Sequence, residues 1–219
     1  MSAGAIFLAL LTGLTVWVLV ARQLTAKSWQ GGSGVGDIGE IDITPAKLGL
    51  WIFMAVVTAL FALFMTAYSM RQHHGEDWTP IVLPQVLWFN TALLVIASIA
   101  LQAARHAVQR SRLRTLKLRL GAAGLFSLAF VGGQLVAWQQ LVASGLLISS
   151  SPAAAFFYLL TAVHGVHLLG GLYVWGRAFG RLAGGAELIA VRPTVELCAV
   201  YWHFLLLVWL ALFALLSSH

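Results

Sequence analysis

The sequence of 219 residues is 60% hydrophobic and only 9% charged. An ordinary soluble domain carries about 25% charged residues, so this composition excludes that class and indicates an integral membrane protein. The formal net charge of +6 suggests nucleic-acid binding at first sight, but the positions of the basic residues, given below, indicate a membrane signal instead. The single cysteine, Cys198, excludes an internal disulfide framework and a cysteine-based zinc site.

The chain begins with an apolar run, Ala5–Val20, which lacks the basic region and the cleavage site of a secretory signal. Residues 1–22 are therefore interpreted as a retained N-terminal transmembrane helix. Residues 23–47 are polar and rich in glycine, which predicts a linker on the cytoplasmic side. Residues 48–219 contain the remaining apolar runs.

Five further runs reach or approach the roughly 20 residues that a helix needs to cross a bilayer. They are Leu48–Met70, Gln85–Ala104, Gly121–Val142, Ala153–Trp175 and Thr194–Leu216. The expected fold class is all-α: a polytopic transmembrane bundle of six helices, of which the last five, in residues 48–219, form one bundle.

The basic residues predict the orientation of the chain. When the chain crosses six times, all but one of the 13 Lys and Arg residues fall on one side, and Arg71 is the exception. Cytoplasmic loops carry the excess of Lys and Arg, so both termini are predicted to lie outside the cytoplasm. The run Arg105–Arg119 is then a cytoplasmic anchor between two spans, and no nucleic-acid partner is expected.

The last two spans contain ionisable residues on shared helix faces. His164 and His167 lie three residues apart, and Glu196 and His203 lie seven residues apart. Such side chains cost several kcal/mol when they face lipid, so partners inside the bundle are expected. From the rise of about 1.5 Å per residue, His167 and His203 lie at similar depth, and a contact between them is geometrically plausible.

The chemistry of these four side chains allows four interpretations. Imidazole and carboxylate suit a zinc or iron site, and histidines on facing helices suit haem ligation. Intramembrane Glu and His are also typical of a proton relay. The fourth interpretation is a hydrogen-bond network that holds two helices together. The spacing alone does not separate them.

The same two spans resemble subunit III of the haem–copper terminal oxidases, the family of cytochrome c oxidase and related quinol oxidases. The penultimate helix of that family carries T-G-x-H-G-x-H and a later glycine, matched here by Thr161, His164, Gly165, His167 and Gly170. The final helix carries Glu, then Y-W-H-F and a later Trp, matched by Glu196, Tyr201, Trp202, His203, Phe204 and Trp209. The resemblance covers roughly Leu48 to the C-terminus, and further matches are Trp51, Phe53, Phe89, Asn90, Thr91, Gln134, Phe156 and Phe157.

The resemblance also has departures. Three membrane carboxylates that are common in the family are replaced here by Val57, Ala137 and Leu206. The first helix is extra relative to five-helix members of the family. The sequence is therefore identified as a divergent member.

The resemblance implies a non-redox accessory subunit of a bacterial inner-membrane oxidase that reduces oxygen to water. The two termini, predicted above to lie outside the cytoplasm, are then expected to be periplasmic. It implies no catalytic residue, no metal and no cofactor in this chain, with haem and copper in partner subunits. Subunit I, on which this chain would pack, subunit II, further small subunits and phospholipid are the implied partners, and the implied role is to support proton uptake and stability of the complex.

The resemblance also assigns roles to residues. The structural polar network is His164, His167, Glu196 and His203. The residues expected to pack or to contact lipid are Trp51, Tyr201, Trp202, Trp209, Arg105 and Arg177. Two alternatives stay open: the accessory subunit associated with nitric oxide reductases, and a free-standing haem-binding membrane protein. A secondary transporter is disfavoured because the sequence has no internal repeat.

Overall fold

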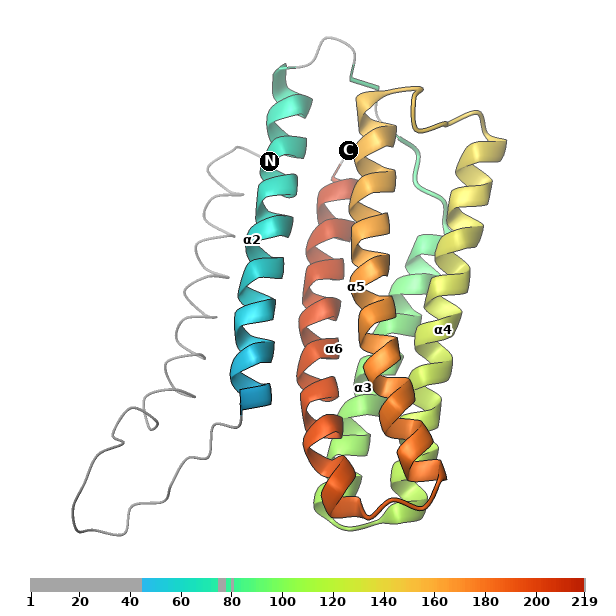
Figure 1. Cartoon of the computed structure of the whole chain (residues 1–219). Coiled ribbons are helices and arrows are strands. Elements are labelled where there is room, and N and C mark those ends of the chain that lie inside the picture. The colour runs from blue at the N-terminus through green and yellow to red at the C-terminus, as the bar shows by residue number, and fades with distance from the viewer. Residues whose placement is uncertain (1–44, 75–77, 80, 219) are drawn as a thin grey trace, which may run out of the picture. The chain divides into compact units, whose positions relative to one another are not determined.

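The computed structural model describes residues 45–74, 78–79 and 81–218. Within them the regular secondary structure is helical, and the helices are α2 (Pro45–His74), α3 (Val86–Gln109), α4 (Leu113–Ala143), α5 (Pro152–Ala183) and α6 (Leu188–Ser217) (Figure 1). The expected all-α class is confirmed for this part of the chain. The sixth expected helix, Ala5–Val20, and the linker up to residue 44 lie outside the described residues.

Each of these five helices is long and apolar enough to cross a membrane. The helices are longer than the spans expected from hydropathy, and the difference is largest at basic residues. α4, for example, begins at Leu113 rather than Gly121, and α5 continues to Ala183 rather than Trp175. Arg, Lys and Leu are good helix formers, so a helix continues after its apolar stretch has ended. The expected span boundaries were therefore too short.

Short connections make successive helices antiparallel. The turn between α3 and α4 contains Ser111, which has a positive φ of 54°, and the turn between α5 and α6 contains Gly185, with a φ of 86°. At the start of α5, the Ser151 hydroxyl accepts a hydrogen bond from the Ala154 N–H at 3.2 Å, and Pro152 occupies the first turn, where no N–H is needed.

The chain divides into two compact units within α2, after Val57. The described part of the first unit is the helical segment Pro45–Val57, which contains Trp51 as a half-buried residue. The second unit, Thr58–His219, contains the rest of α2 and the helices α3 to α6. In this unit α3 packs on α4 and α6, and α5 packs on the same two helices (Figure 1).

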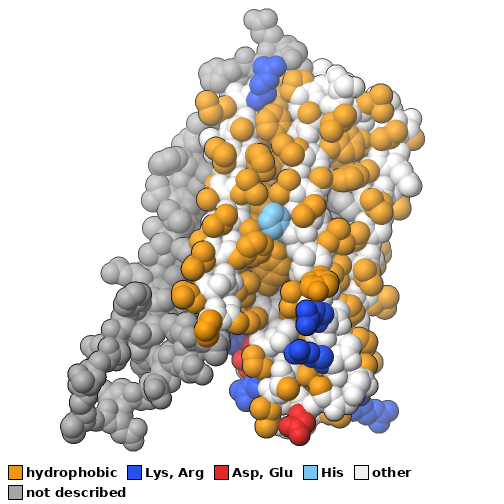
Figure 2. All heavy atoms as spheres, in the orientation of Figure 1, with side chains coloured by type: hydrophobic (Ala, Val, Ile, Leu, Met, Phe, Trp, Pro, Cys, Tyr) orange, Lys and Arg blue, Asp and Glu red, His pale blue; other side chains and the backbone are white. Residues whose placement is uncertain are grey.

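The core of the second unit lies along the inner faces of these helices. Its largest fully buried side chains include two from α6, Trp202 and Trp209, together with Phe130 of α4 and Phe157 of α5. The outer faces are apolar too: exposed Leu, Ile and Val side chains occur on every described helix, and hydrophobic side chains are spread over the described part of the face drawn in Figure 2. Apolar side chains inside and outside are typical of a bundle that lipid surrounds.

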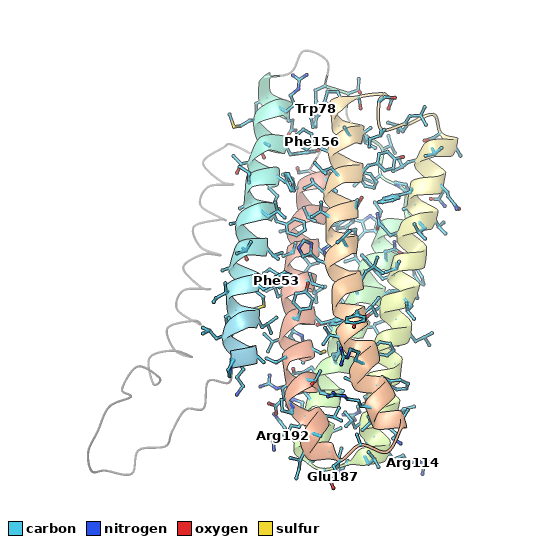
Figure 3. The ribbon with its side chains drawn as sticks, viewed as in Figure 1. Phe53, Trp78, Arg114, Phe156, Glu187 and Arg192 are labelled. Carbon is cyan, nitrogen blue, oxygen red and sulfur yellow. The ribbon has the colours of Figure 1, made fainter. Side chains whose placement is uncertain are left out.

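Charged side chains gather at one end of this bundle. That end carries the α3–α4 and α5–α6 connections and is called here the basic end. Arg114, Glu187 and Arg192 lie there, whereas Trp78 and Phe156 lie at the opposite end (Figure 3). The positions of the functional candidates are given below relative to the basic end.

Candidate functional site

His164 occupies the centre of the bundle. Its side chain is fully buried on α5, and its ring lies 5.2 Å from that of Trp209 and 5.9 Å from that of Phe130, measured between centroids. The Phe61 ring of α2 lies 6.4 Å away on another side. Neither ring nitrogen has a hydrogen-bond partner among the described residues. His164 therefore acts as a packed aromatic side chain between four helices.

His167, one turn further along α5, is half-buried. Its Nδ1 lies 2.7 Å from the carbonyl oxygen of Val163 on the same helix, and its ring packs 5.6 Å from that of Phe61. The Tyr201 hydroxyl of α6 donates to the His167 carbonyl oxygen at 3.0 Å. Tyr201 is thus the α6 side chain that meets this part of α5.

His203 lies on a different flank of α6. Its Nδ1 is 3.0 Å from the Ser98 hydroxyl of α3, and its side chain is exposed. Because an α-helix advances about 100° per residue, His203 points about 200° away from Tyr201, which faces α5. The expected contact between His167 and His203 is replaced by these two separate contacts, since depth alone did not fix which flank each residue occupies.

Glu196 lies nearer the basic end. Its Oε1 accepts from Arg192 Nε at 3.1 Å, an i,i+4 pair on α6, and lies 3.5 Å from Gln109 Nε2 of α3. The Glu196 side chain is 25% exposed and that of Arg192 is 54% exposed. This ion pair is therefore at the surface, where such pairs contribute about 0–1 kcal/mol.

The four candidate polar residues consequently do not form one cluster: His164 and His167 of α5 lie beside Phe61, whereas His203 and Glu196 of α6 contact α3. Within the described residues, no group of three or more His, Cys, Asp and Glu side chains is placed to hold a metal ion. His167 and His203 belong to different interfaces, α5 with Phe61 and α3 with α6, and are not opposed as a pair of axial haem ligands would be. Their arrangement supports helix packing better than ligation.

A second set of polar contacts links the helices, and sequence reasoning did not identify it. Tryptophan N–H groups donate across helix boundaries: Trp202 to Ser127 Oγ (2.9 Å), Trp209 to Thr91 Oγ1 (2.9 Å), Trp138 to Thr161 Oγ1 (3.1 Å) and Trp175 to the Leu120 carbonyl (3.0 Å). Each of the three hydroxyl groups in turn donates a hydrogen bond to a backbone carbonyl oxygen of its own helix. These contacts join α3, α4, α5 and α6. We call them the tryptophan bonds.

Three of the four aromatic candidates are buried, and the fourth, Trp51, is half-buried. Trp202, Trp209 and Tyr201 are buried within the bundle, so they pack against protein rather than lipid. The signal that could have revealed their bonds is the presence of Ser127, Thr91 and Thr161 in apolar runs. A buried indole N–H needs an acceptor, and hydroxyls are among the few acceptors that such runs contain.

Two buried amides lie beside these contacts. Asn90 of α3 and Gln134 of α4 are buried, and their side-chain atoms have no partner among the described residues. Asn90 lies so close to Gly133 of α4 that a Cβ at position 133 would collide with its side-chain oxygen. Gly133 is therefore required for the close approach of α3 and α4.

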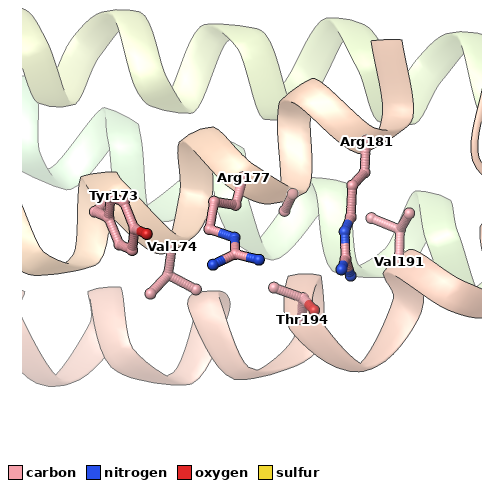
Figure 4. A pocket seen from close by; sticks show the side chains of 7 residues that line it. Tyr173, Val174, Arg177, Arg181, Val191 and Thr194 are labelled. Carbon is pink, nitrogen blue, oxygen red and sulfur yellow. The ribbon is translucent and has the colours of Figure 1, made fainter. Parts of the chain in front are cut away.

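A pocket of about 280 Å³ lies between α5 and α6 near the basic end, lined by Tyr173, Val174, Arg177, Ala178, Arg181, Val191 and Thr194. Arg177 and Arg181 extend from α5 toward α6, where Thr194 projects from the facing helix (Figure 4). Both arginines are exposed, and no acidic side chain lines the pocket. An anionic group with an apolar tail fits this combination of walls.

The remaining candidates lie outside the pocket. Arg105 is half-buried on α3. It does not line the pocket at Arg177, and its charge acts on the ring of His203 of α6. Of the positions where family carboxylates are absent, Val57 and Ala137 are buried and Leu206 is half-buried. Sequence reasoning named Arg177 but missed Arg181 as its companion, although the spacing of four residues places both on one helix face.

Comparison with known proteins agrees with this all-helical membrane architecture. A sequence model of the family described as "Cytochrome c oxidase subunit III" matches residues 5–218. The match covers nearly the whole chain and includes the HGxH and YWHF segments.

Individual relatives support the same assignment. A probable cytochrome c oxidase subunit 3 of Mycobacterium leprae is 31% identical over 160 residues, which cover 72% of this chain and 77% of the relative. The Mycobacterium tuberculosis protein of the same description is 29% identical over 175 residues, 78% of this chain and 86% of the relative. A cytochrome bo(3) ubiquinol oxidase subunit 3 of Pseudomonas aeruginosa is 29% identical over 170 residues, 75% of this chain and 80% of the relative. At these identities, and with a family match over nearly its whole length, the chain belongs to the cytochrome c oxidase subunit III family as a divergent member.

Proposed function

We propose that this protein is the non-redox accessory subunit of a haem–copper terminal oxidase in aerobic respiration. The observation that carries the proposal is the family match over residues 5–218, together with helices suited to cross a membrane. The relatives include subunits of both cytochrome c and ubiquinol oxidases, so the proposal covers the shared reaction, reduction of oxygen to water by the partner subunits.

The placement of the histidines supports a scaffolding role. His164 is enclosed by the rings of Phe61, Phe130 and Trp209, and the other two histidines contact different helices. In this proposal His164, His167, Glu196 and His203 position helices, and haem and copper belong to the partner subunits. The chain packs on subunit I beside subunit II and supports proton uptake and stability there.

Phospholipid is the proposed small-molecule partner. The pocket between α5 and α6 combines the guanidinium groups of Arg177 and Arg181 and the hydroxyl of Thr194 with apolar walls. Guanidinium binds phosphate through paired hydrogen bonds, and basic pockets at the cytoplasmic membrane surface bind anionic head groups. Acyl chains would then continue along the exposed apolar side chains nearby, among them Val174 and Leu169.

The lipid proposal predicts the effect of a double substitution. With Arg177→Gln and Arg181→Gln, the purified protein should retain less anionic phospholipid, by roughly one molecule per chain, because the phosphate loses its cationic partners. Lipid extraction followed by mass spectrometry measures this. Arg114→Gln, an exposed arginine of the basic end outside the pocket, is the matched control and should leave the lipid content unchanged. Equal lipid loss in both variants would contradict the pocket assignment.

The proposed location is the bacterial inner membrane, with the basic end in the cytoplasm and both termini periplasmic. Its support is the concentration of Lys and Arg in the α3–α4 and α5–α6 connections. A cysteine introduced at Ser111, which is exposed in the α3–α4 turn, should react with a membrane-impermeant maleimide only after the cells are opened. Labelling in intact spheroplasts would reverse the orientation.

The proposed function is tested by purifying the tagged chain in mild detergent and recording its visible spectrum and its co-purifying polypeptides. The expected result is that haem-bearing large subunits accompany the chain and that all colour is lost with them in harsher detergent. If the isolated chain keeps haem, its histidines are ligands and the proposed function is wrong. A nitric oxide reductase in the co-purified fraction would instead identify the alternative complex.

A further inference from the structure

The edge of the bundle between α3 and α6 carries hydrogen-bonding side chains far from either helix end. His203 is the 16th residue of the 30 in α6 (188 to 203), and Ser98 is the 13th of the 24 in α3 (86 to 98). At about 1.5 Å per residue, both are more than 15 Å from the ends of their helices. The His203 side chain is nevertheless exposed.

More polar side chains continue from this point to the basic end. Gln102 and His106 approach each other on α3, with 3.3 Å between their Nε2 atoms, and Gln109 Nε2 lies 3.5 Å from Glu196 Oε1 of α6. We call this surface the α3–α6 polar stripe: Ser98, Gln102, His106, Gln109, Glu196 and His203. The opposite half of the same edge, away from the basic end, is apolar, with exposed Leu207 and Trp88, and the exposed apolar residue Ile99 lies next to Ser98 on α3.

The contacts that the His203 ring makes with described polar groups come from α3 and α6. Its Nδ1 lies 3.0 Å from the Ser98 hydroxyl. The ring also interacts with the backbone of Ala199, one turn back on α6, and with the charge of Arg105 of α3. In a neutral imidazole one nitrogen donates and the other accepts. If Nδ1 accepts from Ser98, Nε2 carries the proton; if Nδ1 donates to the Ala199 carbonyl, Nε2 is an acceptor. In both tautomers Nε2 is a polar atom with a hydrogen bond left to make.

Lipid tails cannot provide the hydrogen bond that this nitrogen lacks. The bilayer interior offers no hydrogen-bond partner, and each unsatisfied group costs several kcal/mol there. An imidazole is too short to reach the membrane surface from the middle of a helix, in contrast to Lys or Arg. Polar side chains at this depth face protein partners in membrane bundles, and hydrogen bonds across helices hold such partners together.

We infer that the α3–α6 edge docks a transmembrane helix of the haem-bearing catalytic subunit, which places a hydrogen-bonding group opposite His203 Nε2. The inference rests on the proposed function and adds to it the face that is used. The polar nitrogen at mid-depth requires a partner group, and the apolar half of the edge packs against the same helix. A second copy of this chain, its N-terminal segment 1–44 and lipid alone are the competing occupants.

Photo-crosslinking distinguishes these occupants. A benzophenone amino acid replaces Leu207 on α6 at the edge or, in the control, Leu125 on α4, and both leucines are 66% exposed. In the complex purified in mild detergent, the inference predicts that position 207 crosslinks to the haem-bearing subunit and that position 125 does not.

Each other result has one meaning. One contrary result is that the haem-bearing subunit co-purifies but crosslinks to position 125 and not to position 207. This result would overturn the inference and leave the proposed function intact. Crosslinks from position 207 to a second copy, to the chain's own N-terminal segment or to lipid alone overturn it too. If no haem subunit co-purifies with the unsubstituted chain, the proposed function fails first.

A pair of substitutions tests the role of Nε2 directly. His203→Leu removes the polar nitrogen, whereas His203→Gln keeps both a donor and an acceptor on a side chain of similar reach. With His203→Leu, the haem-bearing subunit should dissociate on the order of tenfold more readily in a detergent titration, and His203→Gln should recover most of that loss. The isolated subunit should keep its helix content in both variants. Equal retention of the haem subunit in both variants would overturn the role of His203.

Discussion

The tryptophan bonds inside the bundle differ from the polar contacts at its α3–α6 edge. In the interior, tryptophan N–H groups donate hydrogen bonds to hydroxyl or carbonyl oxygens of a neighbouring helix. The hydroxyl groups donate in turn to backbone carbonyl oxygens. At the edge, the hydrogen bond between Ser98 and His203 leaves one ring nitrogen at an exposed position. The tryptophan bonds are thus completed within the chain, whereas the polar contacts of the edge reach its surface.

This difference separates two kinds of expected mutational effect. Interior contacts hold α3, α4, α5 and α6 together, so their loss should lower the stability of the subunit by itself. Edge contacts are open to a partner, so their loss should lower the stability of the complex. Three predictions test the distinction, beginning with the largest expected effect on the isolated subunit.

Gly133→Ala should destabilise the isolated subunit by about 1–3 kcal/mol, because the new methyl group meets the Asn90 side chain, which is buried and has no room to move into solvent. Gly132→Ala is the control: this neighbouring glycine of α4 is exposed, and no atom lies within 4 Å of the place that its new methyl group would take. Unfolding in mixed micelles with increasing dodecyl sulfate measures both. Equal stability of the two variants would contradict the close approach of α3 and α4.

Trp202→Phe should cost the subunit about 1–2 kcal/mol, since a fully buried ring becomes smaller and its hydrogen bond to Ser127 is lost. A double-mutant cycle with Ser127→Ala isolates the hydrogen bond, which should couple by about 0.6 kcal/mol and by no more than about 2. Trp88→Phe is the control, because Trp88 is 67% exposed. A coupling energy of zero would show that the tryptophan bonds do not hold the helices.

The double variant His203→Leu with Glu196→Gln should change the stability of the isolated subunit least, by about 1 kcal/mol or less, because both contacts are at the surface. Assembly with the haem-bearing subunit should nevertheless fall, without a change in the haem spectrum of the complex that remains. Size-exclusion chromatography with absorbance detection at the haem band measures both. A fully assembled complex with both residues replaced would contradict the contribution of the α3–α6 edge to assembly.

The fold was largely predictable from the sequence. The five described helices contain the five apolar runs expected between residues 48 and 219. Hydropathy identifies where a chain can enter a membrane, but not where a helix ends outside it, so the spans expected for α4 and α5 were too short. Which helices meet was not predictable, because it depends on the packing of side chains such as Asn90 on Gly133.

The sequence identified the candidate residues but not the contacts that they make. The HGxH and YWHF patterns identified His164, His167 and His203, and the family match confirms the resemblance that they carry. Similar depth made a contact between His167 and His203 plausible, but each makes a separate contact in the structure, because two helices at equal depth still have a free rotation about their axes. That rotation is fixed by Tyr201, which reaches the His167 carbonyl, and by Trp202, which reaches Ser127. The pocket at Arg181 was not predicted either, because the rotation of α5 and α6 about their axes decides which side chains line the space between them.

A cryo-electron microscopy structure of the complex, purified from native membranes in mild detergent, would show directly whether this chain is an accessory subunit without redox groups. We expect it to contain no haem or copper density of its own and to lie beside a haem-bearing subunit, with a helix of that subunit against the α3–α6 edge. Haem density between the helices of this chain, or a preparation in which the chain has no haem-bearing neighbour, would contradict this expectation.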